Sequence, residues 1–272
     1  MRRILPPPRV PDPRRWPDRG LFAAWLGHST VFLKIDGFTV LTDPVFSSRA
    51  GIQVGPVTLG IKRLVAPAVP LVHLPRVDLI LLSHAHMDHW DMRSLRRLES
   101  RHTAVVNPHR TSDLLHVSRY RRVQELSWNQ TTRVGPASVR ALEVRHWGAR
   151  IHNDTWRGYN GYVLDVGRYR VLFAGDTALT TGFRAVRATK AVDLAIMPIG
   201  AYNPWVRFHC TPEQAWQMGN DAGAEFVLPI HHQTFALGRE PLLEPIHRLY
   251  DAAGSRTERI ALRRIGQEFE LP

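Results

Sequence analysis

Short apolar runs separated by breaks that contain glycine, proline and aspartate dominate the first third of the chain. Three runs rich in β-branched and aromatic residues predict strands at 22–26, 30–35 and 38–42. Asp36 and Gly37, between the last two runs, form a typical two-residue hairpin turn. Residues 77–83 form an apolar run that is typical of a strand buried on both faces. The intervening residues 47–76 are rich in glycine and proline and predict a long loop.

Helical and strand patterns alternate in the remainder of the chain. Asp91 can cap a helix through Leu98, because Met92, Leu95 and Leu98 then share one side. Further strands are predicted near 103–106, 138–145, 161–166, 169–174, 192–197 and 225–229, and helices near 110–117, 211–221 and 241–252. Alternation in the middle and hairpins at both ends predict an α/β (α+β) fold, a mixed sheet or sandwich with outer helices.

Length and composition favour a single large globular domain. The chain has 272 residues, of which 44% are hydrophobic and 22% charged. The one cysteine, Cys210, excludes an intrachain disulfide and fits a reducing compartment. There is no apolar run of transmembrane length, and the arginine- and proline-rich start lacks the apolar core of a signal peptide. We therefore expect an irregular arm over 1–20, one domain over 21–272 and a cytoplasmic protein.

The chain is strongly basic, and this changes the range of partners to consider. Its formal net charge is +12, and most of the basic residues are arginines spread along the chain. A basic surface attracts phosphate-bearing partners such as nucleic acid, anionic lipid or small phosphoesters. For any single arginine pair, a solvated surface role is the simpler interpretation.

The densest candidate chemistry is the stretch HAHMDH at 84–89, directly after the buried run. His84 and His86 are two positions apart on an extended segment, so both side chains can face the same way. Asp88 and His89 follow where the chain turns into the predicted helix. Imidazole and carboxylate are common ligands of zinc, and four such groups exceed the three that one catalytic zinc takes from protein. The pattern therefore favours two metal ions over a metal-free structural cluster, with further ligands elsewhere.

The motif H-x-H-x-D-H resembles the signature of the metallo-β-lactamase superfamily, and the other signatures of that superfamily follow in order. The matching residues are Asp43 in LTDPVF, His146 in EVRHWGAR, Asp176 in VLFAGDTA and His231 in VLPIHHQTF. The stretches WLGHSTVFLKIDGFTVLTDPVFSSRA, MPIGAYNPW and HCTPEQA narrow the resemblance to N-acyl-phosphatidylethanolamine-hydrolysing phospholipase D, from about residue 22 to 250.

This resemblance implies an αββα sandwich of the metallo-β-lactamase type with a two-metal site at one edge. It implies that His84, His86 and His146 hold one Zn²⁺, that Asp88, His89 and His231 hold a second, and that Asp176 and a hydroxide bridge them. Mn²⁺ and Fe²⁺ are alternatives, although the redox branch carries a glutamate where this chain has His86. Asp88 and Asp176 would thus be catalytic as well as ligands, and His209 is a candidate for phosphate contact or leaving-group protonation.

Four more residues are implied to surround the metals as supporting or pocket residues: His28, Asp43, Tyr202 and His232. Asp43 is expected to orient a ligand rather than to bind metal itself. The motif match favours His231 over its neighbour His232 as the ligand.

The function implied is hydrolysis of N-acyl-phosphatidylethanolamine or a related phosphodiester. A phosphodiester small molecule or a phospholipid would be the substrate, and peripheral contact with an anionic membrane fits the charge. The apolar loop 51–72, which holds Lys62 and Arg63 for contact with lipid headgroups, could be a lid, a membrane contact or a cover over the core. A lactonase similar to ascorbate-6-phosphate lactonase, and a nucleic-acid or cyclic-nucleotide phosphodiesterase, stay open as alternatives, as does the oligomeric state.

Overall fold

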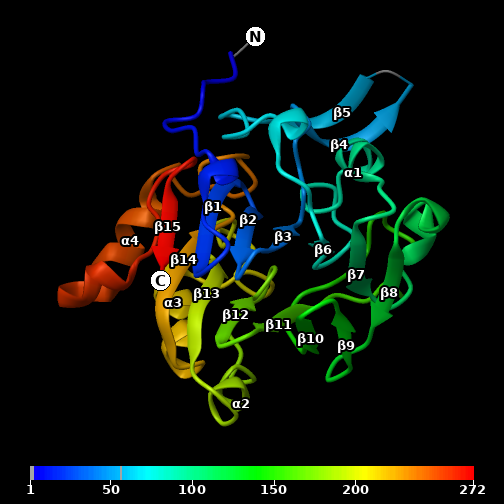
Figure 1. The fold of residues 1–272 in the computed structure, drawn as a ribbon. Helices are drawn as coiled ribbons and strands as arrows, with labels where there is room; N and C mark the ends of the chain where they lie inside the picture. Colours follow the sequence, from blue (N-terminus) through cyan, green and yellow to red (C-terminus); the bar gives the residue numbers. More distant parts are fainter. Residues whose placement is uncertain (1–2, 56) are drawn as a thin grey trace.

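Two mixed β-sheets form the centre of the fold (Figure 1). The computed structural model describes residues 3–55 and 57–272. The seven-stranded sheet has the order β15-β1-β2-β3-β6-β7-β8, the six-stranded sheet has the order β14-β13-β12-β11-β10-β9, and β4 and β5 form a separate hairpin.

The strands are β1 (Leu21–Gly27), β2 (Thr30–Ile35), β3 (Phe38–Thr42), β4 (Arg49–Val54), β5 (Val57–Lys62), β6 (Leu79–Leu81), β7 (Ala104–Pro108), β8 (Arg122–Leu126), β9 (Thr131–Val134), β10 (Ala137–Leu142), β11 (Gly161–Val166), β12 (Tyr169–Phe173), β13 (Val192–Pro198), β14 (Ala224–Ile230) and β15 (Glu268–Leu271). The helices are α1 (Met92–Leu98), α2 (Arg184–Arg187), α3 (Pro212–Asp221) and α4 (Glu244–Ala253), and short 3₁₀ turns connect several of these elements.

Strand alternation divides the interior into two cores. On β13, Leu194 and Ile196 belong to the core between the two sheets, whereas Ala195 and Met197 belong to a second core beneath α3 and α4. Successive residues of a strand point to opposite faces, so a strand that is apolar throughout can fill both cores. Helix α1 packs against the seven-stranded sheet through Leu95. The layers therefore form the αββα sandwich, which confirms the predicted fold class.

Parallel pairing brings several strand ends to one edge of the sandwich. Strands β3, β6 and β7 are parallel in one sheet, and β12, β13 and β14 are parallel in the other. The segments that follow β3, β6, β12 and β14 therefore leave the sheets at their carboxyl ends, where ligand sites of such sheets usually lie.

The predicted loop at 47–76 is wrong over 49–54 and 57–62, because these residues pair as the antiparallel strands β4 and β5. Its apolar residues alternate with glycine and polar residues, and Gly51 faces Gly60 across the hairpin. A Cβ on Gly60 would lie 2.0 Å from the Ala50 carbonyl oxygen, so the close strand approach requires glycine. The assignment of Arg63 to a headgroup contact is also wrong, since its side chain is buried at the hairpin base.

The predicted helix at 110–117 is wrong too, because the chain forms two 3₁₀ turns, Ser112–Leu114 and Val117–Arg119. The Glu125 carboxylate accepts hydrogen bonds from the backbone N–H groups of Arg110, Thr111 and Ser112. A non-local carboxylate thus holds these amides in a turn. The sequence patterns also did not indicate β8, β9, β15 or α2, which are short and half-exposed.

The described part of the N-terminal arm, residues 3–20, contains one 3₁₀ turn at Pro13–Arg15. The Trp16 indole N–H donates to Glu268 on β15 at 2.7 Å, so the arm packs along the C-terminal strand. The division into an arm and one domain stays a prediction. Among the described residues, no helix is long and apolar enough to cross a membrane.

Candidate metal centre

Two groups of histidine and aspartate side chains converge where the two sheets meet. The 84–89 stretch follows β6, and Asp91 then caps α1 by accepting the Arg93 N–H at 3.2 Å. Asp176 follows β12, and His231 follows β14 directly. Each candidate ligand therefore comes from a segment anchored by a buried strand.

The first group is formed by three imidazoles. His86 Nδ1 lies 2.8 Å from His84 Nε2 and 3.3 Å from His146 Nε2. His84 and His86 sit on the segment after β6, whereas His146 comes from the other sheet, after β10. Three nitrogens that face one point are the arrangement in which histidines bind a metal ion.

The second group lies beside it and contains a carboxylate. Asp88 Oδ2 is 3.4 Å from the Nε2 atoms of both His89 and His231. The six residues that resemble ligands thus separate into two sets of three, with each set drawing on both sheets.

Asp176 lies between the two groups. Its Oδ2 is 3.1 Å from the Nε2 atoms of His89 and His231. The same oxygen is 3.9 Å from His84 Nε2 and 3.8 Å from His146 Nε2. One carboxylate oxygen therefore faces imidazoles of both groups.

Buried polar atoms without hydrogen-bond partners test whether metal ions fit these residues. His89 Nε2, His231 Nε2 and Asp176 Oδ1 are buried without a well-aligned hydrogen bond, although both nitrogens lie 3.1 Å from Asp176 Oδ2. Such atoms are rare in folded proteins, and a cation would satisfy them. The cluster therefore fits metal ions, and nitrogen-rich donors of this kind suit zinc and similar transition metals better than Ca²⁺ or Mg²⁺.

The ionisation of the cluster agrees with this assignment. Burial keeps the pKa of His84 and His146 well below the ordinary value, so both are neutral and free to bind metal. Burial alone would raise the pKa of Asp176, but the nearby His231 and His89 more than offset this and hold it well below its usual range. Burial likewise opposes a charged His231, yet Asp176 and Asp88 raise the pKa of this imidazole to about 9. The two carboxylates thus remain anionic and attract positive charge.

Asp43 lies behind the ligands, where it contacts His89 directly and His84 through Ser83. Its Oδ2 lies 2.7 Å from His89 Nδ1 and 2.5 Å from Ser83 Oγ, which is in turn 2.9 Å from His84 Nδ1. Such contacts set the tautomer and ring orientation of metal ligands. The sequence indicated Asp43 but missed Ser83, although a hydroxyl directly before the first histidine was a visible signal.

His146 is held in a different way. The Nδ1 atom of His146 lies 3.0 Å from the carbonyl oxygen of Phe208. The rings of Trp147 and His146 pack with 4.4 Å between their centroids. Trp147 also contacts the ring of Phe208 at 4.4 Å and that of His86 at 4.6 Å. These two aromatic residues border the first group, and the sequence patterns did not single them out.

Three site residues hold strained backbone conformations. His28, Asp43 and His231 have φ angles of 53°, 31° and 64°, which residues other than glycine rarely adopt. Strain of this kind persists where surrounding contacts determine the conformation, and it concentrates at functional sites. Here the His28 N–H donates to Thr234 Oγ1 at 2.6 Å, and the His28 carbonyl accepts the His231 N–H at 3.1 Å.

His28 and His209 both lie against the ligand groups. His28 Nε2 is 2.9 Å from Asp88 Oδ2. His209 Nδ1 is 3.8 Å from Asp176 Oδ2, on the side of His146. Burial lowers the pKa of His209 to about 4 and that of His28 to about 3, so both imidazoles are neutral near pH 7.

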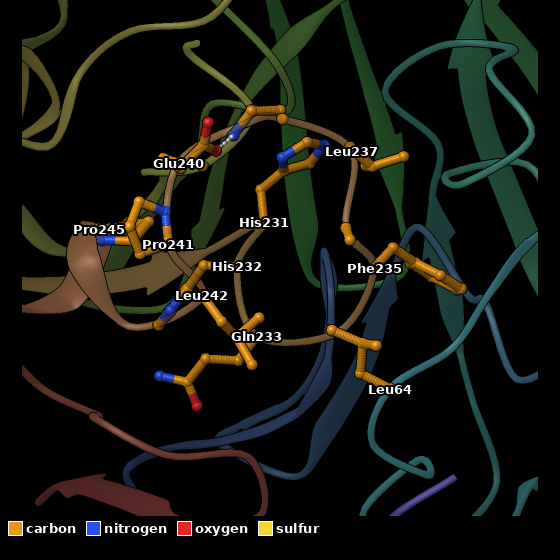
Figure 2. A pocket seen from close by; sticks show the side chains of 14 residues that line it. Leu64, His231, His232, Gln233, Phe235, Leu237, Glu240, Pro241, Leu242 and Pro245 are labelled. Atoms are coloured by element: carbon orange, nitrogen blue, oxygen red, sulfur yellow. Dashed lines mark hydrogen bonds between the residues drawn. The ribbon is translucent and has the colours of Figure 1, made fainter. Parts of the chain in front are cut away.

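His232 and Tyr202 lie farther from the ligand groups. Figure 2 shows His231 and His232 on the wall of a pocket that the following loop surrounds. The His232 ring stacks on Trp25 with 4.5 Å between ring centroids. The Tyr202 hydroxyl instead donates to Glu244 on α4 at 2.7 Å, so the structure turns it toward that helix and away from the cluster.

Comparison with known proteins agrees with this geometry. Residues 39–232 match the family described as "Beta-lactamase superfamily domain". The chain belongs to this family. The matched segment includes every candidate ligand of both groups.

Relatives of this beta-lactamase superfamily chain include two longer proteins, of which it covers about seven tenths. It is 34% identical to an uncharacterised protein of Mycobacterium tuberculosis, covering 92% of this chain and 68% of that protein. It is 29% identical to N-acyl-phosphatidylethanolamine-hydrolyzing phospholipase D 1 of Caenorhabditis elegans, covering 89% and 72% of the two chains.

A solved structure, that of the metallo hydrolase Igni18 from Ignicoccus hospitalis, shares the fold. Its TM-score is 0.69 at 18% identity, covering 93% of this chain and 99% of that one. The protein is thus a metal-dependent hydrolase of the metallo-β-lactamase fold, with a histidine and aspartate cluster that could bind metal ions.

Proposed function

We propose that the protein is a di-zinc phosphodiesterase of the phospholipase D type, acting on N-acyl-phosphatidylethanolamine or a related phosphodiester. The observation that carries the proposal is the position of Asp176 Oδ2, within 3.1 to 3.9 Å of four imidazole nitrogens from both groups. A carboxylate shared in this way fits two metal ions better than one. The name of the Caenorhabditis elegans relative supports the substrate class.

The chain's own residues have separate roles in this proposal. His84, His86 and His146 would hold one ion, and Asp88, His89 and His231 the other, with Asp176 shared. Bound metal ions would lower the pKa of a coordinated water and offset the negative charge of a phosphodiester. Asp43 and Ser83 fix the imidazoles that face them, so the ligand nitrogens are oriented before substrate arrives.

His209 is the residue in this proposal that would act on the substrate without being a ligand. Its imidazole is nearly buried and neutral near pH 7, so it carries one N–H that can donate a hydrogen bond to a phosphate oxygen, whereas protonation of the leaving oxygen would require the imidazolium form.

One experiment tests metal and reaction together. Metal content by mass spectrometry is measured alongside turnover of bis(p-nitrophenyl) phosphate, N-acyl-phosphatidylethanolamine, a lactone set, a cyclic nucleotide and single-stranded RNA. We expect close to two zinc ions per chain and hydrolysis of the first two substrates. Turnover confined to lactones, or to the nucleotides, would contradict the phospholipase assignment and select the corresponding alternative.

A further inference from the structure

The β4–β5 hairpin exposes an apolar face to solvent. Its outward side chains are Ile52, Val54, Val57, Leu59 and Ile61, which are 56%, 57%, 54%, 60% and 42% exposed. Figure 1 shows the hairpin standing away from the two sheets, above α1. Contiguous apolar patches of this kind are uncommon on monomeric proteins and mark interaction surfaces.

The strand register makes the hairpin amphipathic. Ile52 pairs with Leu59 and Val54 with Val57, so these four side chains share one face. The opposite face carries Gln53 paired with Thr58. The apolar face of the hairpin therefore suits an apolar environment, and the opposite face suits water.

The hairpin base is fixed to the body of the protein. The buried Arg63 guanidinium donates to the carbonyl oxygens of Val45 and of Ser47, the latter at 3.0 Å. Ala50, the inner member of the apolar face, packs with Val45 and Phe235 in a small buried cluster. The base of the hairpin thus packs against the body of the protein, whereas the five outer apolar side chains remain exposed.

The hairpin also borders the metal centre. A surface groove is lined on one side by Ile52 and Gln53 and on the other by Met87, Arg96 and Arg150. Met87 lies between His86 and Asp88 in the ligand segment, so the groove reaches the loop that carries the metal ligands. A partner that covers the hairpin would therefore lie beside the site.

Exposed cations lie beside the hairpin. Arg96 on α1 lines a groove together with Ile52 of the apolar face, and Arg93, Arg96 and Arg97 line a second groove together with Gln53 of the opposite face. In a two-fold dimer formed through this face, the patch meets its own copy, so the arginines of the two subunits would face one another and repel. An anionic lipid surface instead attracts them, at about 1 kcal/mol for each basic residue near the membrane.

We propose that the β4–β5 hairpin docks the enzyme on an anionic lipid bilayer. Its apolar face enters the boundary between headgroups and acyl chains, and the α1 arginines contact the lipid phosphates. This inference rests on the proposed function for the idea that the substrate is presented in a bilayer. Docking at this face brings the groove beside the ligand segment to the lipid surface.

Vesicle co-sedimentation of the full, metal-loaded chain tests the inference. The probes are phosphatidylcholine vesicles with and without phosphatidylglycerol. We expect wild-type protein to sediment with the anionic vesicles and far less with neutral ones. Val57→Asn together with Leu59→Asn should weaken the partition coefficient by roughly tenfold or more, because two half-exposed apolar side chains lose their transfer to the membrane.

Matched variants separate the hairpin from general surface effects. Val117→Asn, at a valine that is 46% exposed outside the hairpin, should sediment like wild type, whereas Val57→Asn alone should sediment less. Arg96→Gln should weaken binding to anionic vesicles about fivefold, the ratio that corresponds to 1 kcal/mol, without changing binding to neutral ones. The exposed Arg133→Gln is its control. Thermal unfolding and metal content of each variant check that it is folded.

The outcomes also separate this inference from the proposed function. Wild-type protein that hydrolyses soluble bis(p-nitrophenyl) phosphate but ignores both vesicles overturns the docking inference and leaves the phosphodiesterase proposal intact. Vesicle binding that needs the hairpin, without diester turnover, supports docking and overturns the phosphodiesterase. If light scattering shows a dimer that Val57→Asn with Leu59→Asn dissociates while vesicle binding is unchanged, the hairpin is a subunit contact and the docking inference is wrong.

Discussion

Asp43 and His89, 46 positions apart in the chain, are joined by a 2.7 Å contact between carboxylate Oδ2 and imidazole Nδ1. Strand β3 delivers Asp43, and its parallel neighbour β6 delivers the segment that carries His89. Through Ser83, the same carboxylate also reaches His84 in the other ligand group. One buried carboxylate therefore positions a candidate ligand of each metal ion.

Replacing Asp43 with Asn tests this relationship. The charge that favours the Nδ1–H tautomer of His89 is lost, so metal affinity should fall by roughly 10- to 100-fold. Competition with a chelator measures the affinity. Asp78→Asn is the matched control, because Asp78 accepts hydrogen bonds from Thr39 at the other end of the same two strands. It should lower stability and leave metal affinity unchanged; equal affinity losses in both variants would show a general folding effect.

Replacing Asp176 with Asn tests the shared ligand. The variant keeps the shape but removes the charge that faces both groups, so it should lose at least part of its metal and lower kcat by roughly a hundredfold or more. Metal analysis and turnover of bis(p-nitrophenyl) phosphate measure the two effects. Wild-type metal content together with a wild-type rate would show that Asp176 is not a ligand.

Removing metal should destabilise the protein as well as inactivate it. Without cations, the buried nitrogens of His89 and His231 lose the partners that we assign to them. We expect chelation to lower Tm and abolish turnover, and zinc addition to restore both at close to two ions per chain. Full restoration by a single equivalent would contradict the two-metal assignment.

His209 and His232 should respond differently to substitution by alanine. If His209 contacts phosphate or protonates the leaving oxygen, His209→Ala should retain metal and lose roughly 10²- to 10⁴-fold in rate. A smaller loss with a p-nitrophenolate leaving group would identify protonation, and an equal loss would identify phosphate binding. His232→Ala should cost far less, because His232 stacks on Trp25. Metal loss in His232→Ala, with full retention in His231→Ala, would reverse the assignment of that pair.

The turn held by Glu125 should make stability depend on pH. Burial would raise the pKa of this carboxyl, but hydrogen bonds from Ser112 and neighbouring amides outweigh burial and lower it from 4.5. Because the pKa is lower in the folded state, the charged carboxylate stabilises the fold above pH 4.5. This stabilisation is lost as the pH falls through the lower, folded-state pKa. The free energy of unfolding of Glu125→Gln should therefore lie below that of wild type at neutral pH, and the gap should narrow in acid.

Denaturant titrations from pH 7 to 3 measure this gap. Glu225→Gln, at an exposed glutamate, is the control. Its free energy of unfolding should differ from that of wild type by the same amount at every pH. A gap for Glu125→Gln that stays constant across the range would mean that the charge of Glu125 does not hold the turn.

The sequence by itself determined the parts of this protein that depend on neighbouring residues. The apolar run before His84 and the spacing of the 84–89 stretch are local patterns, and strand alternation turns them into a buried strand followed by clustered side chains. Alternation predicted a mixed sheet or sandwich with outer helices, and the resemblance of the motifs then implied the αββα arrangement. The Asp36-Gly37 turn likewise needs only two residues to specify it.

Tertiary structure alone decided features that depend on contacts between distant segments. Arg63 looked like a surface cation until the carbonyl groups of Val45 and Ser47 gave its guanidinium buried partners. The helix predicted at 110–117 does not form, because the Glu125 carboxylate binds the backbone amides there. Glu125 lies on a strand that the sequence patterns did not indicate. Single-chain periodicity reports which face of a segment is apolar, but it does not report which distant polar group will satisfy the backbone or charge of that segment, and this choice sets the local conformation.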